Sequence, residues 1–170
     1  MSAASKLDAM SESDAREALA RCCGASRWVG GMLARRPFGA DEALMRAADE
    51  VWASMEEADI LEAFAHHPRI GASMEELEKR FASTSRWASG EQAGARGASA
   101  ETLAALRDGN LAYEERFGFI FIVCATGKSA DEMLALLQAR VDNDRQTELR
   151  IAAAEQAKIT KIRLEKLEDA

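Results

Sequence analysis

Apolar side chains recur at intervals of three and four residues along most of this 170-residue chain, which is the spacing of amphipathic helices. Capping sequences and glycine or proline stops divide that pattern into segments. The resulting prediction is a set of helices at about 11–22, 26–33, 41–55, 59–66, 73–81, 99–117, 129–141 and 145–167. We therefore expect an all-α fold, a single-domain bundle of about eight helices spanning residues 1–170.

The two longest predicted helices have clear inward faces. The face of the helix at 99–117 is expected to carry Leu103, Leu106, Asn110, Tyr113 and Phe117. The face of the helix at 145–167 is expected to carry Leu149, Ala152, Gln156, Ile159 and Ile162. Both helices should therefore contribute to the core.

The run Phe119–Cys124 breaks the helical pattern, because its aromatic and β-branched residues favour a strand. No second strand candidate accompanies it, and one strand cannot form a sheet. We therefore interpret residues near 119–125 as a short buried extended segment, with an overridden helix start as the alternative. Most of these side chains belong to the core. An extended backbone would still need hydrogen-bond partners, and a small amide-rich ligand is one candidate.

Composition and charge narrow the class of protein. Hydrophobic residues make up 48% of the chain and charged residues 30%, which is typical of a soluble globular domain and excludes a disordered chain. The net charge of −7 argues against nucleic-acid binding, which needs a basic surface. No apolar run approaches the roughly 20 residues that span a bilayer, and residues 1–6 lack the apolar segment of a secretory signal. We expect a cytoplasmic protein with no membrane partner.

The three cysteines provide neither a disulfide framework nor a metal site. Cys22 and Cys23 are adjacent, so they can neither close a strain-free disulfide nor hold zinc as a Cys-x-x-Cys pair does, and Cys124 is remote. An odd count without a secretory signal indicates reduced thiols. We expect all three to be small core-filling residues, with no metal bound.

One candidate for chemistry is the pair of histidines before Pro68. His66 and His67 are the only imidazoles in the chain, so an imidazole acid or base working near neutral pH must be one of them. Pro68 disfavours helix at His67, which places His67 at a helix end where its side chain could project into a cleft. The alternative is that Pro68 simply stops a helix and the histidines cover its end.

A second candidate is Ser89-Gly90-Glu91-Gln92, in which Ser89 and Gln92 have the spacing of a capping box. This stretch is either an exposed helix N-terminus or one that offers free N–H groups to a polar or anionic ligand. In the second case Glu91 adds an acceptor, and Gln92 adds both a donor and an acceptor.

Several motifs together resemble the 2-oxo-4-hydroxy-4-carboxy-5-ureidoimidazoline (OHCU) decarboxylase family. They are, in chain order, Cys22-Cys23-Gly24-Ala25-Ser26-Arg27-Trp28, Arg36-Pro37-Phe38, the stretch 61–68 ending in His67-Pro68, Glu91-Gln92, Phe117-Gly118-Phe119 with Phe121, and Ile162-Arg163-Leu164. Each motif alone is weak, whereas their order over nearly the whole chain is specific. The chain departs from the family at Ile120, where members usually carry proline.

The resemblance implies an all-α carboxy-lyase of urate breakdown that is commonly dimeric. Members remove CO2 from OHCU to give (S)-allantoin without a metal or organic cofactor. We therefore expect this small molecule as substrate, no cofactor, and a homodimer. The catalytic residues that the resemblance implies are His67 and Glu91. The substrate-binding residues that it implies are Pro68, Ala88, Ser89, Gly90, Gln92, Phe121, Ile122, Val123, Cys124, Ala125 and Arg163.

In this assignment His67 is the general acid or base, and protonation occurs on one face of the intermediate. Glu91 would orient His67 or the ureido N–H groups, and a neighbouring carboxylate would raise the pKa of His67. Arg163 would pair with an anionic or carbonyl edge of the substrate; the alternative is a surface arginine near a helix C-terminus. Two other functions fit the sequence: a non-catalytic helical interaction module, and a related lyase acting on another cyclic ureide.

Overall fold

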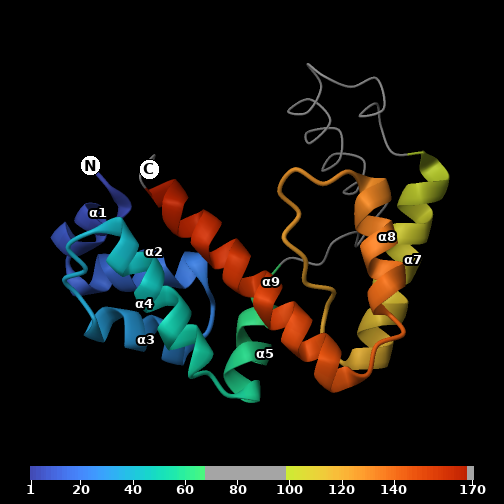
Figure 1. Ribbon diagram of the computed structural model, residues 1–170, viewed down its shortest axis with the longest axis horizontal. Coiled ribbons are helices and arrows are strands. Elements are labelled where there is room, and N and C mark those ends of the chain that lie inside the picture. The colour runs from blue at the N-terminus through green and yellow to red at the C-terminus, as the bar shows by residue number, and fades with distance from the viewer. Residues whose placement is uncertain (68–98, 168–170) are drawn as a thin grey trace. The chain divides into compact units, whose positions relative to one another are not determined.

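The structure of the protein is a computed structural model that describes residues 1–67 and 99–167. All regular secondary structure in those two ranges is helical (Figure 1). The helices are α1 (Ala3–Ala9), α2 (Glu12–Cys22), α3 (Ser26–Ala34), α4 (Asp41–Ala53), α5 (Glu57–Ala65), α7 (Ala100–Phe117), α8 (Ala130–Arg140) and α9 (Arg145–Lys166). The prediction of an all-α fold is confirmed. The predicted helix at 73–81 lies outside the described residues.

The chain divides into two compact units. The first unit comprises Met1–His67 and Ala153–Ala170, and the second comprises Pro68–Ala152. Because the boundary falls within α9, the beginning of this helix belongs to the second unit and the remainder to the first. The expectation of one domain over residues 1–170 stays a prediction.

Serine caps begin three of the helices, as their sequences predict. The side-chain oxygens of Ser11, Ser99 and Ser129 accept hydrogen bonds from the backbone N–H groups three residues later, at the starts of α2, α7 and α8. Gly118 ends α7 with a φ of +81°, a left-handed conformation that glycine adopts without strain. The boundaries of these helices therefore follow from local sequence.

Three helix starts differ from the sequence prediction. Helix α1 precedes the first predicted helix, and Ser2 caps it by accepting a hydrogen bond from the N–H of Ser5 at 3.2 Å. Ser26 is the first residue of α3 rather than its cap, which is Ala25. Helix α5 begins at Glu57 rather than Asp59, because Glu56 and Asp59 form a reciprocal capping box.

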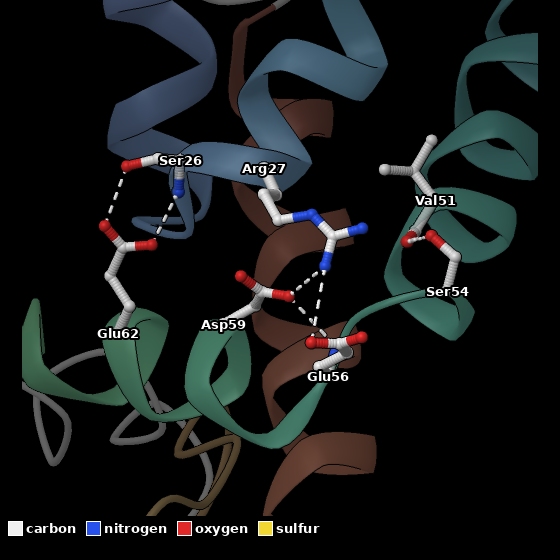
Figure 2. A network of polar contacts seen from close by, with 7 residues as sticks. All are labelled: Ser26, Arg27, Val51, Ser54, Glu56, Asp59 and Glu62. Atoms are coloured by element: carbon white, nitrogen blue, oxygen red, sulfur yellow. Dashed lines mark hydrogen bonds and ion pairs between the residues drawn. The ribbon is translucent and has the colours of Figure 1, made fainter.

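A polar network joins α5 to the start of α3 (Figure 2). The carboxylate of Glu62 accepts hydrogen bonds from the backbone N–H and the hydroxyl of Ser26, at 2.9 and 2.7 Å. Glu62 thus supplies the capping that α3 lacks at Ala25, and the bonds to Ser26 lower the pKa of Glu62. Arg27 donates to Asp59 at 2.8 Å. Helix α5, which ends at the two histidines, is therefore fixed against α3.

The first unit packs helices α1 to α5 and the end of α9 around an apolar core. Trp28 is fully buried there, and its indole N–H donates to the carbonyl of Ala48 on α4 at 3.3 Å. Cys22 and Cys23 belong to the same core. These two and Cys124 are buried, and none of the three forms a disulfide, as predicted.

In the second unit α7 and α8 lie side by side (Figure 1). Tyr113 on α7 is fully buried, and its ring centroid lies 4.6 Å from that of Phe117 and 5.2 Å from that of Phe121. The Tyr113 hydroxyl donates to the carboxylate of Glu148 at 2.5 Å. Burial and this hydrogen bond raise the pKa of Tyr113. The aromatic cluster joins the segment after α7 to α7 itself.

Residues 119–125 form neither helix nor strand. The buried members are Phe119, Phe121, Ile122, Val123 and Cys124. Because α8 begins only at Ala130, the alternative of an overridden helix start is wrong. The prediction of a buried, non-helical segment is confirmed.

The predicted inward faces are largely correct. On α7, Leu103, Leu106, Tyr113 and Phe117 are buried and Asn110 is half-buried. On α9, Leu149, Ala152 and Gln156 are buried, whereas Ile159 and Ile162 are only half-buried. Thr160 and Leu164 are buried instead, because the packed face of α9 continues from Gln156 at intervals of four residues rather than three.

Alanine substitutions at the adjacent Gly30 and Gly31 in α3 test how closely α3 packs on α4. A Cβ at Gly31 would lie 2.7 Å from Cγ1 of Val51, so we expect Gly31→Ala to lower the free energy of unfolding by about 1–3 kcal/mol through overpacking. A Cβ at Gly30 meets nothing within 4 Å, so Gly30→Ala should stabilise the protein by up to about 1 kcal/mol. Urea unfolding measures both values, and equal stability of the two variants would contradict the close approach.

Candidate active site

His67 follows the last turn of α5. Helix α5 ends at Ala65, and the backbone N–H of His67 donates to the carbonyl of Phe64 at 3.1 Å. The side chain of His66 is exposed, whereas His67 is half-buried. The position of His67 at a helix end is therefore confirmed, and only one of the two imidazoles enters the protein interior.

The imidazole of His67 meets a buried amide from α9. Its Nε2 lies in hydrogen-bond contact with Oε1 of Gln156, a side chain with no exposed surface. The amide nitrogen of Gln156 donates to the hydroxyl of Thr160 at 3.0 Å. Since Oε1 can only accept, Nε2 of His67 must carry the proton. The neutral ring then keeps the lone pair of Nδ1 available for another partner.

Gln156, Thr160 and Arg163 lie on one face of α9, at intervals of four and three residues. Arg163 is half-buried, and one of its guanidinium nitrogens donates to the carbonyl of Arg21 at 3.3 Å. Among the described residues no carboxylate forms an ion pair with Arg163. Within residues 1–67 and 99–167 its hydrogen-bond partner is thus a backbone carbonyl.

Burial lowers the pKa of His67 below its ordinary value of 6.5. The hydrogen bond to Gln156 opposes that shift, while the positive charges of Arg163 and His66 add to it. The described surroundings therefore favour the neutral imidazole. The carboxylate expected to raise this pKa, Glu91, lies outside the described residues.

Gly24 allows the loop between α2 and α3 to lie against the end of α5. A Cβ at this position would lie 2.5 Å from ring carbons of His66 and 2.6 Å from its Cβ. Burial raises the pKa of the neighbouring Cys23 thiol, which also contacts the hydroxyl of Thr160. The residues around His67 are therefore packed from three elements: α5, α9 and this loop.

The second unit holds the other described candidates, Phe121, Ile122, Val123, Cys124 and Ala125. Arg140 donates to the carbonyl of Ile122 at 2.8 Å. The ammonium group of Lys128 donates to the carbonyl of Cys124 at 2.7 Å, and its backbone N–H donates to the carbonyl of Ala125 at 3.0 Å. Within residues 1–67 and 99–167, by contrast, the N–H groups of Ile122 and Val123 make no hydrogen bond. Buried N–H groups need partners, so this backbone is suited to a ligand that accepts hydrogen bonds.

The predicted site residues therefore fall into three groups. His67 and Arg163 belong to the first unit, where both contribute to one electrostatic environment. Phe121–Ala125 belong to the second unit. The remaining six, Pro68, Ala88, Ser89, Gly90, Glu91 and Gln92, lie outside the described residues.

Sequence reasoning missed Gln156 and Thr160 as site residues. It placed Gln156 on the inward face of a helix but gave it no role. The available signal was a polar stripe, Gln156, Thr160 and Arg163, on the same face as apolar residues. A buried amide needs partners, and the only described partners of Gln156 are His67 and Thr160.

No group of three potential metal ligands occurs among the described residues. None of the helices within those ranges combines the length and apolar character needed to cross a membrane.

Comparison with known proteins identifies relatives of the chain. The model of the OHCU decarboxylase family matches residues 8–165. The uric acid degradation bifunctional protein TTL of Arabidopsis thaliana is 39% identical over 147 residues, which are 86% of this chain and 45% of that protein. The chain thus spans less than half of that relative. The 2-oxo-4-hydroxy-4-carboxy-5-ureidoimidazoline decarboxylase of Haloferax volcanii is 31% identical over 140 residues, 82% of this chain and 80% of that protein.

Solved structures agree with these relatives. The crystal structure of OHCU decarboxylase in the presence of (S)-allantoin matches with a TM-score of 0.73 and 35% identity, covering 89% of this chain and 96% of that one. The crystal structure of (S)-allantoin synthase matches with a TM-score of 0.71 over 98% of this chain and 54% of that one, at 18% identity, which shows the fold alone. The resemblance carried by the sequence motifs is confirmed: the chain belongs to the OHCU decarboxylase family.

Proposed function

We propose that this protein is a carbon–carbon lyase that removes CO2 from 2-oxo-4-hydroxy-4-carboxy-5-ureidoimidazoline and yields (S)-allantoin in urate degradation. Family membership and the 35% identical decarboxylase structure support this reaction. The observation that carries it is the half-buried imidazole of His67, which contacts Gln156 through Nε2 and lies within the electrostatic influence of Arg163.

The substrate's own structure makes a cofactor unnecessary. The carbon that loses CO2 carries a hydroxyl, and its ring neighbour belongs to a conjugated C=N bond. When the bond to the carboxylate breaks, its electron pair forms a double bond to the neighbouring ring carbon, and the electrons of the C=N bond move to its nitrogen. That nitrogen takes up a proton from solvent, which leaves an enol. The hydroxyl proton then leaves as the carbonyl forms, and the neighbouring carbon takes up a proton. The protein must align the breaking bond with the π system and direct that proton to one face.

His67 suits the proton transfer. Its lowered pKa keeps the ring neutral, and Gln156 fixes the proton on Nε2, which leaves Nδ1 as a base. Nδ1 takes the hydroxyl proton as the carbonyl forms. The resulting imidazolium can return a proton to carbon. In the family assignment, Glu91 orients His67 or the ureido group.

Arg163 suits the substrate's anionic or carbonyl edge, because its planar guanidinium offers several donors and has no carboxylate partner among the described residues. Backbone N–H groups of the segment Phe121–Ala125 would bind the ring. The residues Pro68, Ala88, Ser89, Gly90 and Gln92 would complete the binding surface, with the Gln92 amide matching the ureido group.

The remaining expectations rest on the family. The family match runs through both compact units, which supports treating residues 1–170 as one decarboxylase domain. We also propose a cytoplasmic homodimer that works without metal or organic cofactor.

The two histidines provide a matched pair for testing the reaction. OHCU is generated in situ from urate with uricase and the preceding hydrolase, and circular dichroism follows the appearance of optically active allantoin. We expect His67→Asn to lower kcat by about 10²–10⁴-fold, the usual contribution of a general acid or base. His66→Asn should retain activity, because His66 is exposed. Equal activity of wild type and His67→Asn would remove His67 from the mechanism.

Protonation of His67 also couples pH to stability. Its pKa is below 6.5 in the folded protein, so the unfolded chain binds this proton more readily. The contribution of His67 to the free energy of unfolding is therefore full above about pH 6.5 and is lost as the pH falls through that value towards the folded pKa. Urea unfolding between about pH 8 and pH 5 should show this loss. The loss should persist in His66→Asn and diminish in His67→Asn; an unchanged slope in His67→Asn would contradict the buried neutral imidazole.

Arg163 can be tested against an exposed arginine of the same helix. We expect Arg163→Met to raise KM by about 10- to 100-fold, which corresponds to loss of a hydrogen bond to a charged group. Arg150→Met removes an exposed arginine and should leave KM unchanged. A wild-type KM in Arg163→Met would instead support the surface-arginine alternative.

A further inference from the structure

Two buried charges in the second unit have no part in the proposed chemistry. The side chains of Arg140 and Glu148 are 8% and 0% exposed and form an ion pair. Oε1 of Glu148 accepts hydrogen bonds from Nε of Arg140 at 2.6 Å and from the hydroxyl of Tyr113 at 2.5 Å. Oε2 accepts from the amide of Asn143 at 3.1 Å. Both oxygens of the Glu148 carboxylate therefore have donors, and the guanidinium of Arg140 is held in one orientation.

Arg140 in turn holds two consecutive residues of the segment 119–125. Its Nη1 donates to the carbonyl oxygen of Ile122 at 2.8 Å. Its guanidinium carbon lies 4.6 Å from the ring centroid of Phe121, within the range of a cation–π contact. The second terminal nitrogen, Nη2, lies 2.5 Å from Glu148 Oε1 but lacks hydrogen-bond geometry. The carbonyl of Ile122 therefore receives its donor from a side chain that is itself fixed.

Because the peptide bond is planar, the contact between Arg140 and the Ile122 carbonyl also fixes the direction of the next N–H group. The carbonyl of Ile122 and the N–H of Val123 belong to one planar trans unit, in which they point to opposite sides. Fixing the carbonyl on Arg140 aims the N–H of Val123 away from Arg140. Val123 is buried, and in the described part of the chain its N–H has no hydrogen-bond partner.

We propose that Arg140, oriented by Glu148, is a positioning residue that presents the N–H of Val123 to the substrate. This inference rests on the proposed function, in which the backbone of the segment Phe121–Ala125 binds the substrate ring. Arg140 touches no reacting atom; its contribution is to prevent rotation of the Ile122–Val123 peptide. The residue selects for a substrate edge that accepts a hydrogen bond at that place, such as a ring carbonyl.

The sequence offers a selective spectroscopic readout of this peptide. Ile122-Val123 is the only Ile-Val pair in the chain, so a protein labelled with carbonyl-13C isoleucine and 15N valine gives a single HNCO correlation. Its 13C shift reports the hydrogen bond from Arg140, and its amide shifts report binding at Val123. In the wild type we expect the amide shifts to move on titration with (S)-allantoin, used as the probe.

The decisive variant replaces the ion pair by apolar residues, Arg140→Met with Glu148→Leu. A well-packed apolar pair can substitute for a buried ion pair without loss of stability, so the fold should survive. We expect the Ile122 carbonyl to move upfield, the Val123 response to (S)-allantoin to disappear, and kcat/KM to fall about 100-fold, as for a misplaced binding group. The matched control, Arg35→Met with Glu50→Leu, removes an exposed ion pair of the first unit and should change none of these.

Arg140→Lys keeps the charge and a donor and should recover part of kcat/KM together with part of the carbonyl shift. If the double variant does not fold, this single variant carries the test. A folded variant that loses the carbonyl shift but keeps wild-type kcat/KM and the Val123 response would overturn the positioning role. A wild type that produces no optically active allantoin contradicts the proposed function instead, so the two failures are distinguishable.

Discussion

The carboxylate of Glu148 has no exposed surface, and a buried charge is tolerated only when it is paired and hydrogen-bonded. Its donors come from three places: Tyr113 on α7, Arg140 at the end of α8, and Asn143 in the turn before α9. Satisfying one carboxylate therefore fixes how these elements meet within the second unit. Through Arg140 the same constraint reaches the backbone after α7, which has no helical hydrogen bonds of its own.

In the first unit, one buried amide constrains the packing of its neighbours in a similar way. Gln156 is a buried amide whose oxygen and nitrogen both need partners, and it finds them in His67 and Thr160. The end of α5 is held from its other side by Glu62 and Asp59, which contact α3. The imidazole thus lies directly after a helix and contacts a second helix through Gln156, and this contact defines its tautomer.

Most of the fold could be predicted from capping residues and helix stops in the local sequence. Ser99 and Gly118 delimit α7 because a serine cap and a left-handed glycine act within a few residues of the chain. The count of two imidazoles and the helix stop at Pro68 made His67 a candidate, and the resemblance to the family then gave it the catalytic role. The family motifs then extended the predicted site to Arg163 and the segment Phe121–Ala125, in which Phe121 to Cys124 are buried and no residue is helical.

Contacts between residues far apart in the sequence could not be predicted from these local signals. Gln156 reads as a core position, and its contact with His67 joins residues 89 apart, which no periodicity encodes. The pairing of Arg140 with Glu148 crosses a turn between two helices, so helical spacing does not reveal it. The start of α3 was misassigned for the same reason, because its capping oxygen comes from Glu62 on another helix.

Cys22 and Cys23 lie in the core of the first unit, where burial raises the pKa of both thiols, that of Cys22 to about 11. At neutral pH roughly one Cys22 in ten thousand is a thiolate, the form that alkylating reagents and peroxide attack. Modification therefore requires the core to open, which exposes the thiol and returns its pKa to the ordinary value. The adjacent thiols act as an internal reporter: their alkylation rate in native buffer measures how often the first unit opens.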